Sequence, residues 1–592
     1  MKSLTHLNKY FFKYRYQLLL GMVFVAVNNY FGAEAKLYVG KGTDYVKDLM
    51  ASHVPFGSDI NWKLLGFGGL IMGLVLLQAI FMFFMRQMII VMSRHIEYDL
   101  KNEIYAHYQT LDQSFYKRNN TGDLMNRISE DVSRVRMYLG PAVMYITSTI
   151  GTIVFTIPYM LHINVRLTLI ILSPMPIIVL AIWYVSSLIN RRSTEVQQQL
   201  SSISTFTQET YSGIRVMKAF AREGSINNRF ETETHQYRSL YMRLAKTEGA
   251  FQPLVVLLVG ISNVLAIWFG GMAYIRGEIH LGEIITLLMF IYGLTWPIAS
   301  LGWVTSLVQR AAASQERINE FLRTQPVIQS HIASVPVTLN GKIEFTNVSL
   351  RYEDSGVVAL KDISFTLLPG KSMAIVGKTG SGKSTVAGLL TRLYDVTSGE
   401  IKIDEMPVRT IHLPSLRGSI GYVPQEVFLF SDSIASNIRF GAKDGTVSEE
   451  DIVHAAKVVD IHNSIMEFPE QYNTLLGERG ITLSGGQKQR ISMARAIVKA
   501  PSILIFDDCL SAVDTETEEV ILRNLGAVMK EKTTLIISHR ISSVKHCDQI
   551  IVLENGVIAE QGNHDSLLRE NGIYAGLYAQ QLLENQIKVE LG

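Results

Sequence analysis

The chain has 592 residues, which is more than one hydrophobic core normally serves, so we expect at least two domains. Apolar residues make up 48% and charged residues only 18%, below the roughly 25% charged content of soluble proteins, which predicts a chain partly dissolved in lipid. A formal net charge of +2 excludes a strongly basic nucleic-acid binder, and no nucleic-acid partner is expected. Both cysteines, Cys509 and Cys547, lie in the polar C-terminal half, which favours reduced cytosolic thiols.

Residues 1–16 mix aromatic side chains with four basic ones, Lys2, Lys9, Lys13 and Arg15. This composition predicts a short helix that lies in the cytoplasmic interface of a membrane, and a disordered basic tail is the alternative. No short apolar stretch ending in a small-residue cleavage site is evident here. We therefore expect the first membrane helix to act as its own uncleaved signal.

Six apolar stretches before residue 310 are long enough to cross about 30 Å of hydrocarbon. They lie at about 17–35, 64–92, 138–161, 165–187, 250–274 and 281–304. Any one of them alone is compatible with a buried helix of a soluble protein. Six in succession predict a transmembrane domain over residues 17–310.

The links between these stretches alternate in length and charge. The links after the second and fourth stretches run to about 45 and 60 residues and hold most of the Lys and Arg residues of this region. Since an excess of positive charge marks the cytoplasmic side, both long links and both chain ends are expected in the cytoplasm, and the chain in the cell membrane, plasma or inner. The first external loop, roughly 36–62, runs against this pattern because it carries Lys36, Lys41 and Lys47.

After a polar connector at 311–340, residues 377–384 form a complete P-loop of the pattern G-x-x-x-x-G-K-[ST]. The motif follows an apolar strand, Met373 to Val376, and opens a helix, which is the context that it requires. Lys383 is expected to neutralise the β- and γ-phosphates of ATP, and the Ser384 hydroxyl to bind Mg²⁺. The other predicted ATP-binding residues of this segment are Gly377, Lys378, Thr379, Gly380, Ser381, Gly382 and Thr385.

A second apolar strand, Ile503 to Phe506, ends in Asp507, which is placed to hold the Mg²⁺ shell as a Walker B acid. Between the two motifs the chain reads Leu483-Ser484-Gly485-Gly486-Gln487. LSGGQ is the signature of the ABC ATPases, and the chain resembles that family from about 341 to 580. The resemblance implies a nucleotide-binding domain over this range, with residues 581–592 as a C-terminal tail.

Further motifs of the family follow in its order and spacing. Tyr352 is similar to the A-loop aromatic residue that stacks on adenine, and Gln425 to the Q-loop glutamine that senses Mg²⁺ and the membrane domain. His539 resembles the switch histidine that contacts the γ-phosphate. Ser511-Ala512-Val513-Asp514 resembles the D-loop, and Leu476-Gly477-Glu478-Arg479-Gly480 the X-loop of exporters.

The membrane half fits the same resemblance. Residues 121–132 and 209–223 are similar to the intracellular loops of six-helix ABC exporters, whose short coupling helices rest in clefts of the nucleotide-binding domains. The expected fold is therefore an α-helical membrane domain with six transmembrane helices plus an α/β P-loop ABC ATPase domain. The resemblance lies with the lipid and multidrug exporter branch, and it implies ATP hydrolysis that drives efflux.

The chain has one P-loop and one LSGGQ, whereas in this family ATP lies between the P-loop of one domain and the signature of another. A second half-transporter is thus the expected partner. Ser484, Gly485, Gly486 and Gln487 are expected to act on the partner's ATP, because they supply donors for the γ-phosphate that the P-loop side lacks.

One residue departs from the family pattern. Where the family has Glu directly after the Walker B Asp, to polarise the attacking water, this chain has Asp508. Its stem is one CH₂ shorter, and a misplacement of about an ångström can cost on the order of 100-fold in rate. The favoured hypothesis is a heterodimer in which this chain contributes a weak ATP site. The alternative is a homodimer with two slow Asp-based sites, in which His539 is intact.

Other functions fit less well. Importers usually keep their membrane and ATPase parts on separate chains, six spans exclude a soluble ABC protein of DNA repair or translation, and no room is expected for an N-terminal peptidase domain. The substrate is expected to be a small hydrophobic or amphipathic compound or a membrane lipid. The candidates to line its cavity, each of which packing between helices explains equally well, are Asn28, Asn29, Gln78, Gln252, Asn263, Phe81, Phe83, Phe84, Trp183, Tyr184, Trp268 and Trp296.

Overall fold

The computed structural model describes residues 2–52, 58–330, 336–443, 445–477, 480, 483–511 and 513–591. The chain divides into two compact units. The first comprises Met1–Gln109 and Thr121–Thr324, and the second comprises Thr110–Asn120 and Gln325–Gly592. A short segment between the second and third long helices of the first unit therefore belongs to the second unit.

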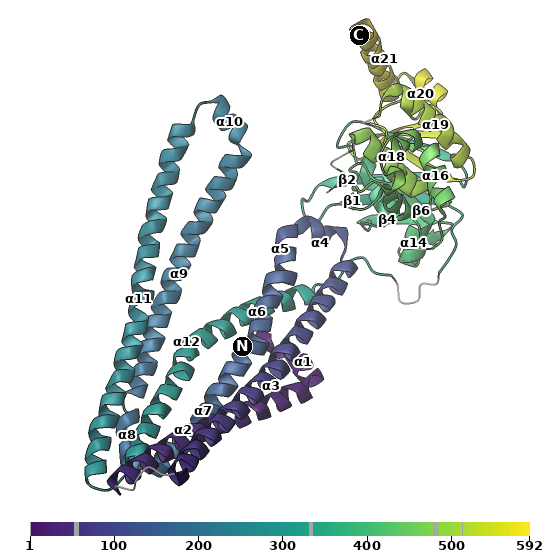
Figure 1. Cartoon of the computed structure of the whole chain (residues 1–592). Helices are drawn as coiled ribbons and strands as arrows, with labels where there is room; N and C mark the ends of the chain where they lie inside the picture. The colour runs from purple at the N-terminus through teal and green to yellow at the C-terminus, as the bar shows by residue number, and fades with distance from the viewer. Residues whose placement is uncertain are drawn as a thin grey trace. The chain divides into compact units, whose positions relative to one another are not determined.

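The first unit is helical throughout (Figure 1). Its elements are η1 (Lys2–Leu7), α1 (Asn8–Lys13), α2 (Arg15–Ala51), α3 (Ser58–Thr110), α5 (Thr121–Asn126), η2 (Arg127–Asp131), α6 (Val132–Met137), η3 (Tyr138–Ala142), α7 (Val143–Ile163), α8 (Val165–Leu172), α9 (Met175–Ser212), α10 (Ile214–Ala219), α11 (Glu223–Ile275) and α12 (Leu281–Arg323). Within the described ranges, six helical segments are long and apolar enough to cross a membrane, which confirms the predicted fold class of this half.

The long helices exceed the thickness of a bilayer. With a rise of about 1.5 Å per residue, the 53 residues of α11 extend roughly 80 Å, against about 30 Å of hydrocarbon. Helices α9 and α11 run side by side and are joined at one end by the short helix α10 (Figure 1). The charged residues of the long links therefore lie on continuations of the apolar helices rather than in loops.

The helix ends differ from the expected spans in two places. Helix α2 continues to Ala51, so Lys36, Lys41 and Lys47 lie on a helix and not in the loop expected at 36–62. Helix α12 reaches Arg323, so the first part of the expected connector 311–340 is helical. Hydropathy marks only the part of a helix that lies in the hydrocarbon of the membrane. The helix itself continues as long as its hydrogen bonds and packing permit.

Two carboxylates of α3 bind side chains of the N-terminal segment. The Asp99 carboxylate accepts hydrogen bonds from Lys13 Nζ (2.6 Å) and the Tyr14 hydroxyl (3.0 Å), and Lys9 pairs with Glu103 in the same way (2.7 Å). The basic residues of the predicted interfacial segment are thus partly paired within the unit. Its position relative to lipid stays a prediction.

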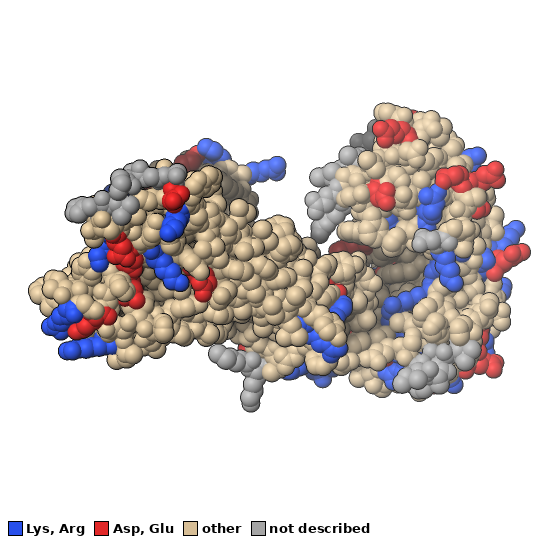
Figure 2. Space-filling view, turned by 60° about the horizontal axis from the view of Figure 1, so that its bottom comes forward, with Lys and Arg blue, Asp and Glu red and all other residues tan. Residues whose placement is uncertain are grey.

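The membrane unit also contains polar contacts that the apolar pattern hides. The Tyr159 hydroxyl donates to the Glu34 carboxylate (2.6 Å), and the Thr152 hydroxyl donates to Asn29 Oδ1 (2.9 Å). Glu34 lies within the first predicted span and was not among the expected lining residues. On the face shown in Figure 2, wide areas of this unit carry none of Lys, Arg, Asp or Glu, as expected for a surface in contact with lipid.

The second unit contains two sheets. A four-stranded antiparallel sheet has the order β2-β1-β4-β5, and a six-stranded sheet has the order β10-β9-β3-β8-β7-β6, parallel except for the β9–β10 pair. The strands are β1 (Ile343–Arg351), β2 (Val358–Leu367), β3 (Ser372–Val376), β4 (Ser398–Ile403), β5 (Met406–Pro407), β6 (Ile420–Val423), β7 (Ile503–Asp507), β8 (Thr533–Ile537), β9 (Gln549–Glu554) and β10 (Val557–Gly562). Strands β7 and β8 are buried at every residue, which is typical of parallel strands covered on both faces.

Helices complete this unit, and their packing against the parallel sheet forms an α/β domain (Figure 1). They are α4 (Gln113–Arg118), α13 (Lys383–Leu390), α14 (Leu413–Ser419), α15 (Ile434–Arg439), α16 (Glu449–Val458), α17 (His462–Met466), η4 (Gln471–Asn473), α18 (Gly485–Ile497), α19 (Thr515–Met529), α20 (His564–Glu570) and α21 (Ile573–Leu591). The α/β P-loop fold predicted for this half is confirmed.

Both cysteines of this unit are free and buried, and burial raises the pKa of the Cys509 thiol and, to about 12, that of the Cys547 thiol. Because only the thiolate reacts, both thiols should react slowly with a thiol reagent at pH 7 to 8 in the native protein and rapidly after denaturation. A chromogenic thiol assay with and without denaturant measures this difference. Rapid labelling of two thiols per native chain would contradict it.

Candidate functional site

The predicted nucleotide site forms where the parallel strands end. Strand β3 pairs with β8, β8 with β7 and β7 with β6, all in parallel, so their carboxyl ends share one edge of the sheet. The P-loop follows β3, Asp507 ends β7, and Gln425 and His539 follow β6 and β8. Ligands of open α/β sheets bind at this edge, and the sequence-predicted residues meet there.

The P-loop turns tightly into α13. Gly380 and Gly382 have φ values of +84° and +99°, which favour glycine, and the Cβ of any other residue at 382 would lie 2.4 Å from the Ala359 carbonyl oxygen. Lys383 Nζ donates to the carbonyl oxygens of Gly377 and Lys378, at 2.8 Å each. The buried Ser381 hydroxyl has no hydrogen-bond partner within the described part of the chain. A loop with an unused buried hydroxyl and an adjacent ammonium group fits a phosphate chain.

Two groups suited to Mg²⁺ lie beside this loop. The Ser384 hydroxyl donates to the Asp507 carboxylate (2.8 Å), and the Tyr422 hydroxyl lies 3.4 Å from the other carboxylate oxygen. Burial raises the pKa of Asp507, and burial likewise lowers the pKa of Lys383, so the site penalises both charges until they face an opposite charge. Among the described residues no group of three or more His, Cys, Asp or Glu could hold a metal. Mg²⁺ needs no such cluster, since it binds through one or two protein groups, water and substrate phosphates.

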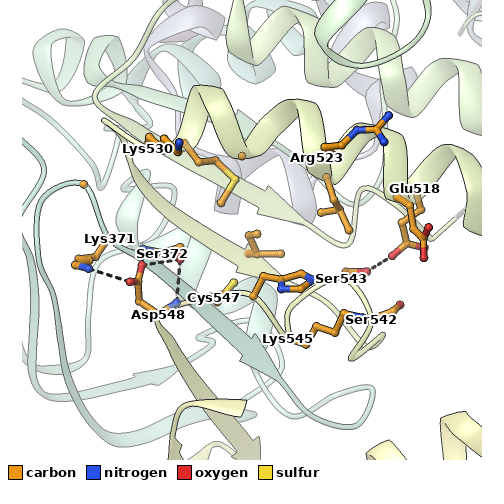
Figure 3. Close-up of a pocket in the computed structure, with 17 residues that line it drawn as sticks. Lys371, Ser372, Glu518, Arg523, Lys530, Ser542, Ser543, Lys545, Cys547 and Asp548 are labelled. Carbon is orange, nitrogen blue, oxygen red and sulfur yellow. Dashed lines mark hydrogen bonds and ion pairs between the residues drawn. The ribbon is translucent and has the colours of Figure 1, made fainter. Parts of the chain in front are cut away.

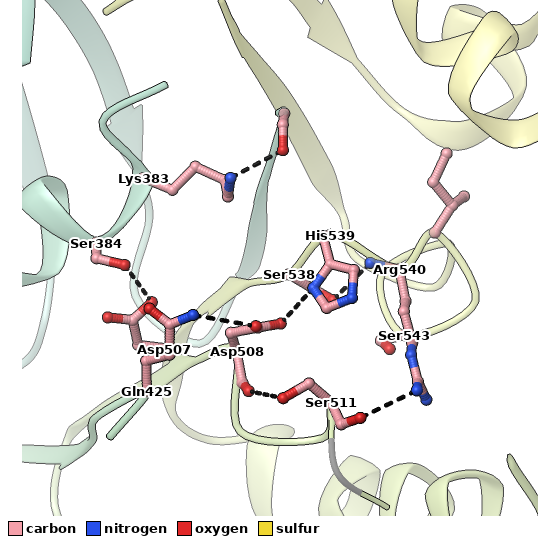
Figure 4. A network of polar contacts seen from close by, with 12 residues as sticks. Lys383, Ser384, Gln425, Asp507, Asp508, Ser511, Ser538, His539, Arg540 and Ser543 are labelled. Atoms are coloured by element: carbon pink, nitrogen blue, oxygen red, sulfur yellow. Dashed lines mark hydrogen bonds and ion pairs between the residues drawn. The ribbon is translucent and has the colours of Figure 1, made fainter. Parts of the chain in front are cut away.

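Gln425, Asp508 and His539 are the residues predicted to take part in catalysis, and they meet at the Asp508 carboxylate (Figure 4). Asp508 Oδ1 lies 2.8 Å from His539 Nδ1, and Asp508 Oδ2 accepts from Gln425 Nε2 at 3.5 Å. The Asp508 backbone N–H donates to the Ile537 carbonyl (2.8 Å), and its φ of +49° lies in the left-handed region, which Asp tolerates better than most residues. Asp508 is thus held between the segments that follow β6 and β8.

Sequence reasoning missed a second layer of contacts behind His539. Arg540 donates to the Glu518 carboxylate (2.8 Å) and to the Ser511 carbonyl (3.1 Å), and the Ser511 hydroxyl donates to the Asp508 carbonyl (3.0 Å). Glu518 on α19 is only 2% exposed, and its other oxygen accepts from Ser543. The available signal was the Arg directly after the predicted switch histidine, but its partner lies 22 residues earlier in the chain.

The signature and D-loop residues begin helices. Ser484 and Gln487 form a capping box at the start of α18, in which Gln487 Oε1 accepts from the Ser484 N–H (3.0 Å), and Ser484 and Gly485 are exposed. Asp514 caps α19 by accepting from the Thr517 N–H (2.9 Å), which lowers the pKa of Asp514. Ala512 of the D-loop and Glu478 and Arg479 of the X-loop lie outside the described residues.

The signature and the P-loop of the same chain are not joined by polar contacts in the part of the chain that the structure describes. In the described ranges, no hydrogen bond or ion pair joins residues 484–487 to residues 377–384. The start of α18 is exposed at Ser484 and Gly485, and the partial positive charge of a helix start suits an anion.

The predicted adenine-stacking residue lies beside α4, within the second unit. The Tyr352 hydroxyl is 3.1 Å from Thr385 Oγ1, and its ring meets the Tyr394 ring edge to face. Lys117 Nζ lies 5.1 Å and 5.0 Å from the centroids of these two rings, which is within range of a cation–π contact. Lys117, Tyr352 and Tyr394 line a cavity of about 590 Å³.

Both halves of the chain match known protein families. The family described as the ABC transporter transmembrane region matches residues 18–298, and the family described as ABC transporter matches residues 360–511. The chain is 38% identical over 482 residues to "Uncharacterized ABC transporter ATP-binding protein YknU" of Bacillus subtilis (strain 168), covering 81% of this chain and 82% of that protein. The chain belongs to the ABC transporter family.

Other ABC transporters are similar over as much of the chain. "Probable multidrug resistance ABC transporter ATP-binding/permease protein YheI" of Bacillus subtilis (strain 168) is 37% identical over 487 residues, 82% of this chain and 83% of that protein. An "ATP-dependent lipid A-core flippase" of Syntrophus aciditrophicus (strain SB) is 34% identical over 516 residues, with 87% and 84% covered. The solved "Structure of a bacterial Atm1-family ABC exporter with ATP bound" superposes with a TM-score of 0.79 at 26% identity, covering 96% of this chain and 98% of that one.

These matches confirm the predicted family, its fusion of membrane and ATPase domains, and ATP hydrolysis coupled to transport. The ABC transporter described here is a multi-span membrane exporter that binds ATP in a cytoplasmic domain and works as a dimer. The individual roles of its site residues stay predictions.

The first of these roles is that of Lys383. Replacing it by Ala should weaken ATP binding about 10- to 100-fold, because hydrogen bonds to charged groups are worth about 1.5–3 kcal/mol. Titration with a fluorescent ATP analogue measures the affinity. Lys402→Ala on β4, which removes a lysine paired with Glu400 at the surface, is the matched control and should bind like the wild type. Equal affinities of the two variants would contradict the role of Lys383.

Proposed function

We propose that this chain is one half of a heterodimeric exporter for hydrophobic or amphipathic compounds, a drug or a lipid, and that it contributes the weaker of two ATP sites. Asp508, at the position where the family has Glu, carries the proposal. The names of the flippase and of the multidrug relative support the substrate class.

In this proposal each side chain near the P-loop has one role. Tyr352 stacks on adenine, Lys383 neutralises the phosphates, and Ser384 and Asp507 hold Mg²⁺, with Gln425 in reach of the same edge. Bound Mg²⁺ supplies charge for the leaving phosphate oxygens. Ser484 to Gln487 act on the nucleotide of the partner chain, which their exposed helix start favours, and Asp514 is the D-loop residue.

The weak step is the activation of water. Asp508 is held by His539 and Gln425, but its carboxylate is one CH₂ closer to the backbone than that of Glu. Water held about an ångström from its productive position can react on the order of 100-fold more slowly. The groups that we expect to bind ATP are complete, so binding should persist where hydrolysis is slow.

A homodimer with two slow sites is the second candidate, and one observation favours it. The Asp508–His539 contact of 2.8 Å joins two groups that both act on the γ-phosphate side in this family, so Asp508 is positioned and not merely retained. Such a site hydrolyses ATP slowly rather than not at all.

Two segments support the coupling of this site to the membrane helices. Helix α4, which comes from the loop between α3 and α5, places Lys117 over Tyr352 and directly precedes the predicted coupling segment 121–132. In the other segment, 209–223, three residues are exposed at 71%, 63% and 73%: Tyr211 near the end of α9, Val216 on α10 and Phe220 directly after α10. An apolar tip of this kind suits docking onto the ATPase domain of the second subunit.

The decisive experiment on the ATP site compares the purified chain with its Asp508→Glu variant. The proposal predicts slow ATP hydrolysis by the wild-type chain alone and a rate at least 10-fold higher for the variant, because the longer stem restores the reach of the carboxylate. Asp508→Asn is the control and should stay slow. Brisk turnover of the wild-type homodimer that Asp508→Glu does not improve would sink the weak-site proposal.

The coupling role of α4 has its own test. Lys117→Ala should lower substrate efflux per ATP hydrolysed severalfold in vesicles, since it removes the cation that lies over Tyr352 and Tyr394. Lys117→Arg keeps the positive charge and should retain coupling. If both variants transport and hydrolyse in the wild-type ratio, α4 does not couple through this contact.

A further inference from the structure

The last helix of the chain is anchored in the ATPase domain at its first turn. The Glu560 carboxylate accepts the backbone N–H groups of Ile573 and Tyr574, the second at 3.0 Å. Tyr574 is fully buried, and its hydroxyl lies 2.7 Å from His564 Nδ1. Helix α21 therefore starts from a fixed base in the ATPase domain and continues into the predicted C-terminal tail as far as Leu591.

Two turns later the same helix contacts the segment of the predicted switch histidine. Gln581 Nε2 donates to the His539 carbonyl (2.6 Å), and Gln581 Oε1 accepts from the Ile541 backbone N–H (2.8 Å). One amide thus satisfies two backbone groups on either side of Arg540, and only one orientation of the amide can do so. Ile541 is 1% exposed, so its N–H would otherwise be shielded from water.

Other side chains also hold this segment. Arg540 pairs with Glu518, and Glu518 also accepts from Ser543, a contact visible in Figure 3 at the edge of a cavity of about 700 Å³. Glu518 and Ser543 border this cavity, whereas Gln581 bonds directly to the backbone of the segment.

We propose that Gln581 is a positioning residue for His539, and that α21 sets the backbone of the switch segment through it. The proposal rests on the catalytic role proposed for His539, and it adds a function for the C-terminal helix. When the amide clamps residues 539 and 541, the imidazole ring is kept at the Asp508 carboxylate. When α21 shifts, the clamp opens and the ring loses its support. The C-terminal helix is thereby a control point for hydrolysis.

The test measures ATP hydrolysis by this chain purified alone, where no stronger partner site sets the rate, in the variants Gln581→Ala and Gln581→Glu. A neutral hydrogen bond changes an equilibrium by about fivefold, so loss of both should lower kcat about 5- to 30-fold with an unchanged KM for ATP. Gln581→Glu keeps an acceptor for the Ile541 N–H but sets a second carboxylate oxygen against the His539 carbonyl, so its kcat should fall at least as far as that of Gln581→Ala. Leu583→Ala, on the exposed side of the same helix, is the control and should behave like the wild type.

Hydrogen exchange at the Ile541 amide tests the clamp without relying on catalysis. Gln581→Ala should speed this exchange at least fivefold, while the P-loop amides stay as protected as in the wild type. Unchanged protection of Ile541 would overturn the clamp. An unchanged kcat for Gln581→Ala, in a purified chain whose kcat falls for His539→Ala, would overturn the positioning role. If His539→Ala itself leaves kcat unchanged, the role proposed for His539 is wrong and the positioning role falls with it.

Discussion

The parallel pairing of β3, β8 and β7 is the constraint on which the rest of the site depends. These strands are short and buried on both faces, so their register is fixed by close packing rather than by turns. The pairing brings Ile375, Ile537 and Asp507 into line, and the groups that follow them emerge at one edge. A phosphate-binding loop, an acid and a histidine from distant parts of the chain therefore share one site.

Only one of the two groups of predicted ATP-contacting residues lies at that edge. The P-loop, Asp507 and Asp508 gather around the place for a phosphate chain, and the signature at the start of α18 faces outward. In the described part of the chain, no hydrogen bond or ion pair connects the two. Under the proposed function, the second set of γ-phosphate donors comes from another subunit when it approaches. ATP binding then becomes an association event, and association can move helices that are much longer than the bilayer is thick.

Motifs with local geometry could be predicted from the sequence. The P-loop glycines, the strand that ends in Asp507 and the six apolar helices depend on neighbours within a few residues, and the structure has them where they were expected. Contacts between distant segments that carry no family motif could not be predicted. The Arg540–Glu518 pair, the Glu34–Tyr159 hydrogen bond and the Gln581 contacts each join elements whose meeting is decided by tertiary packing. The ends of α2 and α12 were missed for a related reason, since hydropathy stops at the lipid boundary and the helix does not.

The central claim is that this chain supplies only half of each ATP site. It is tested most directly by the ATPase rate of the assembled dimer when this chain carries Ser484→Arg, a bulky change at the exposed start of α18. The account predicts that turnover falls at least 10-fold while the isolated chain binds ATP with unchanged affinity, because the signature acts on the nucleotide of the other subunit. Undiminished turnover of that dimer, or a loss of ATP affinity in the isolated chain, would contradict the account.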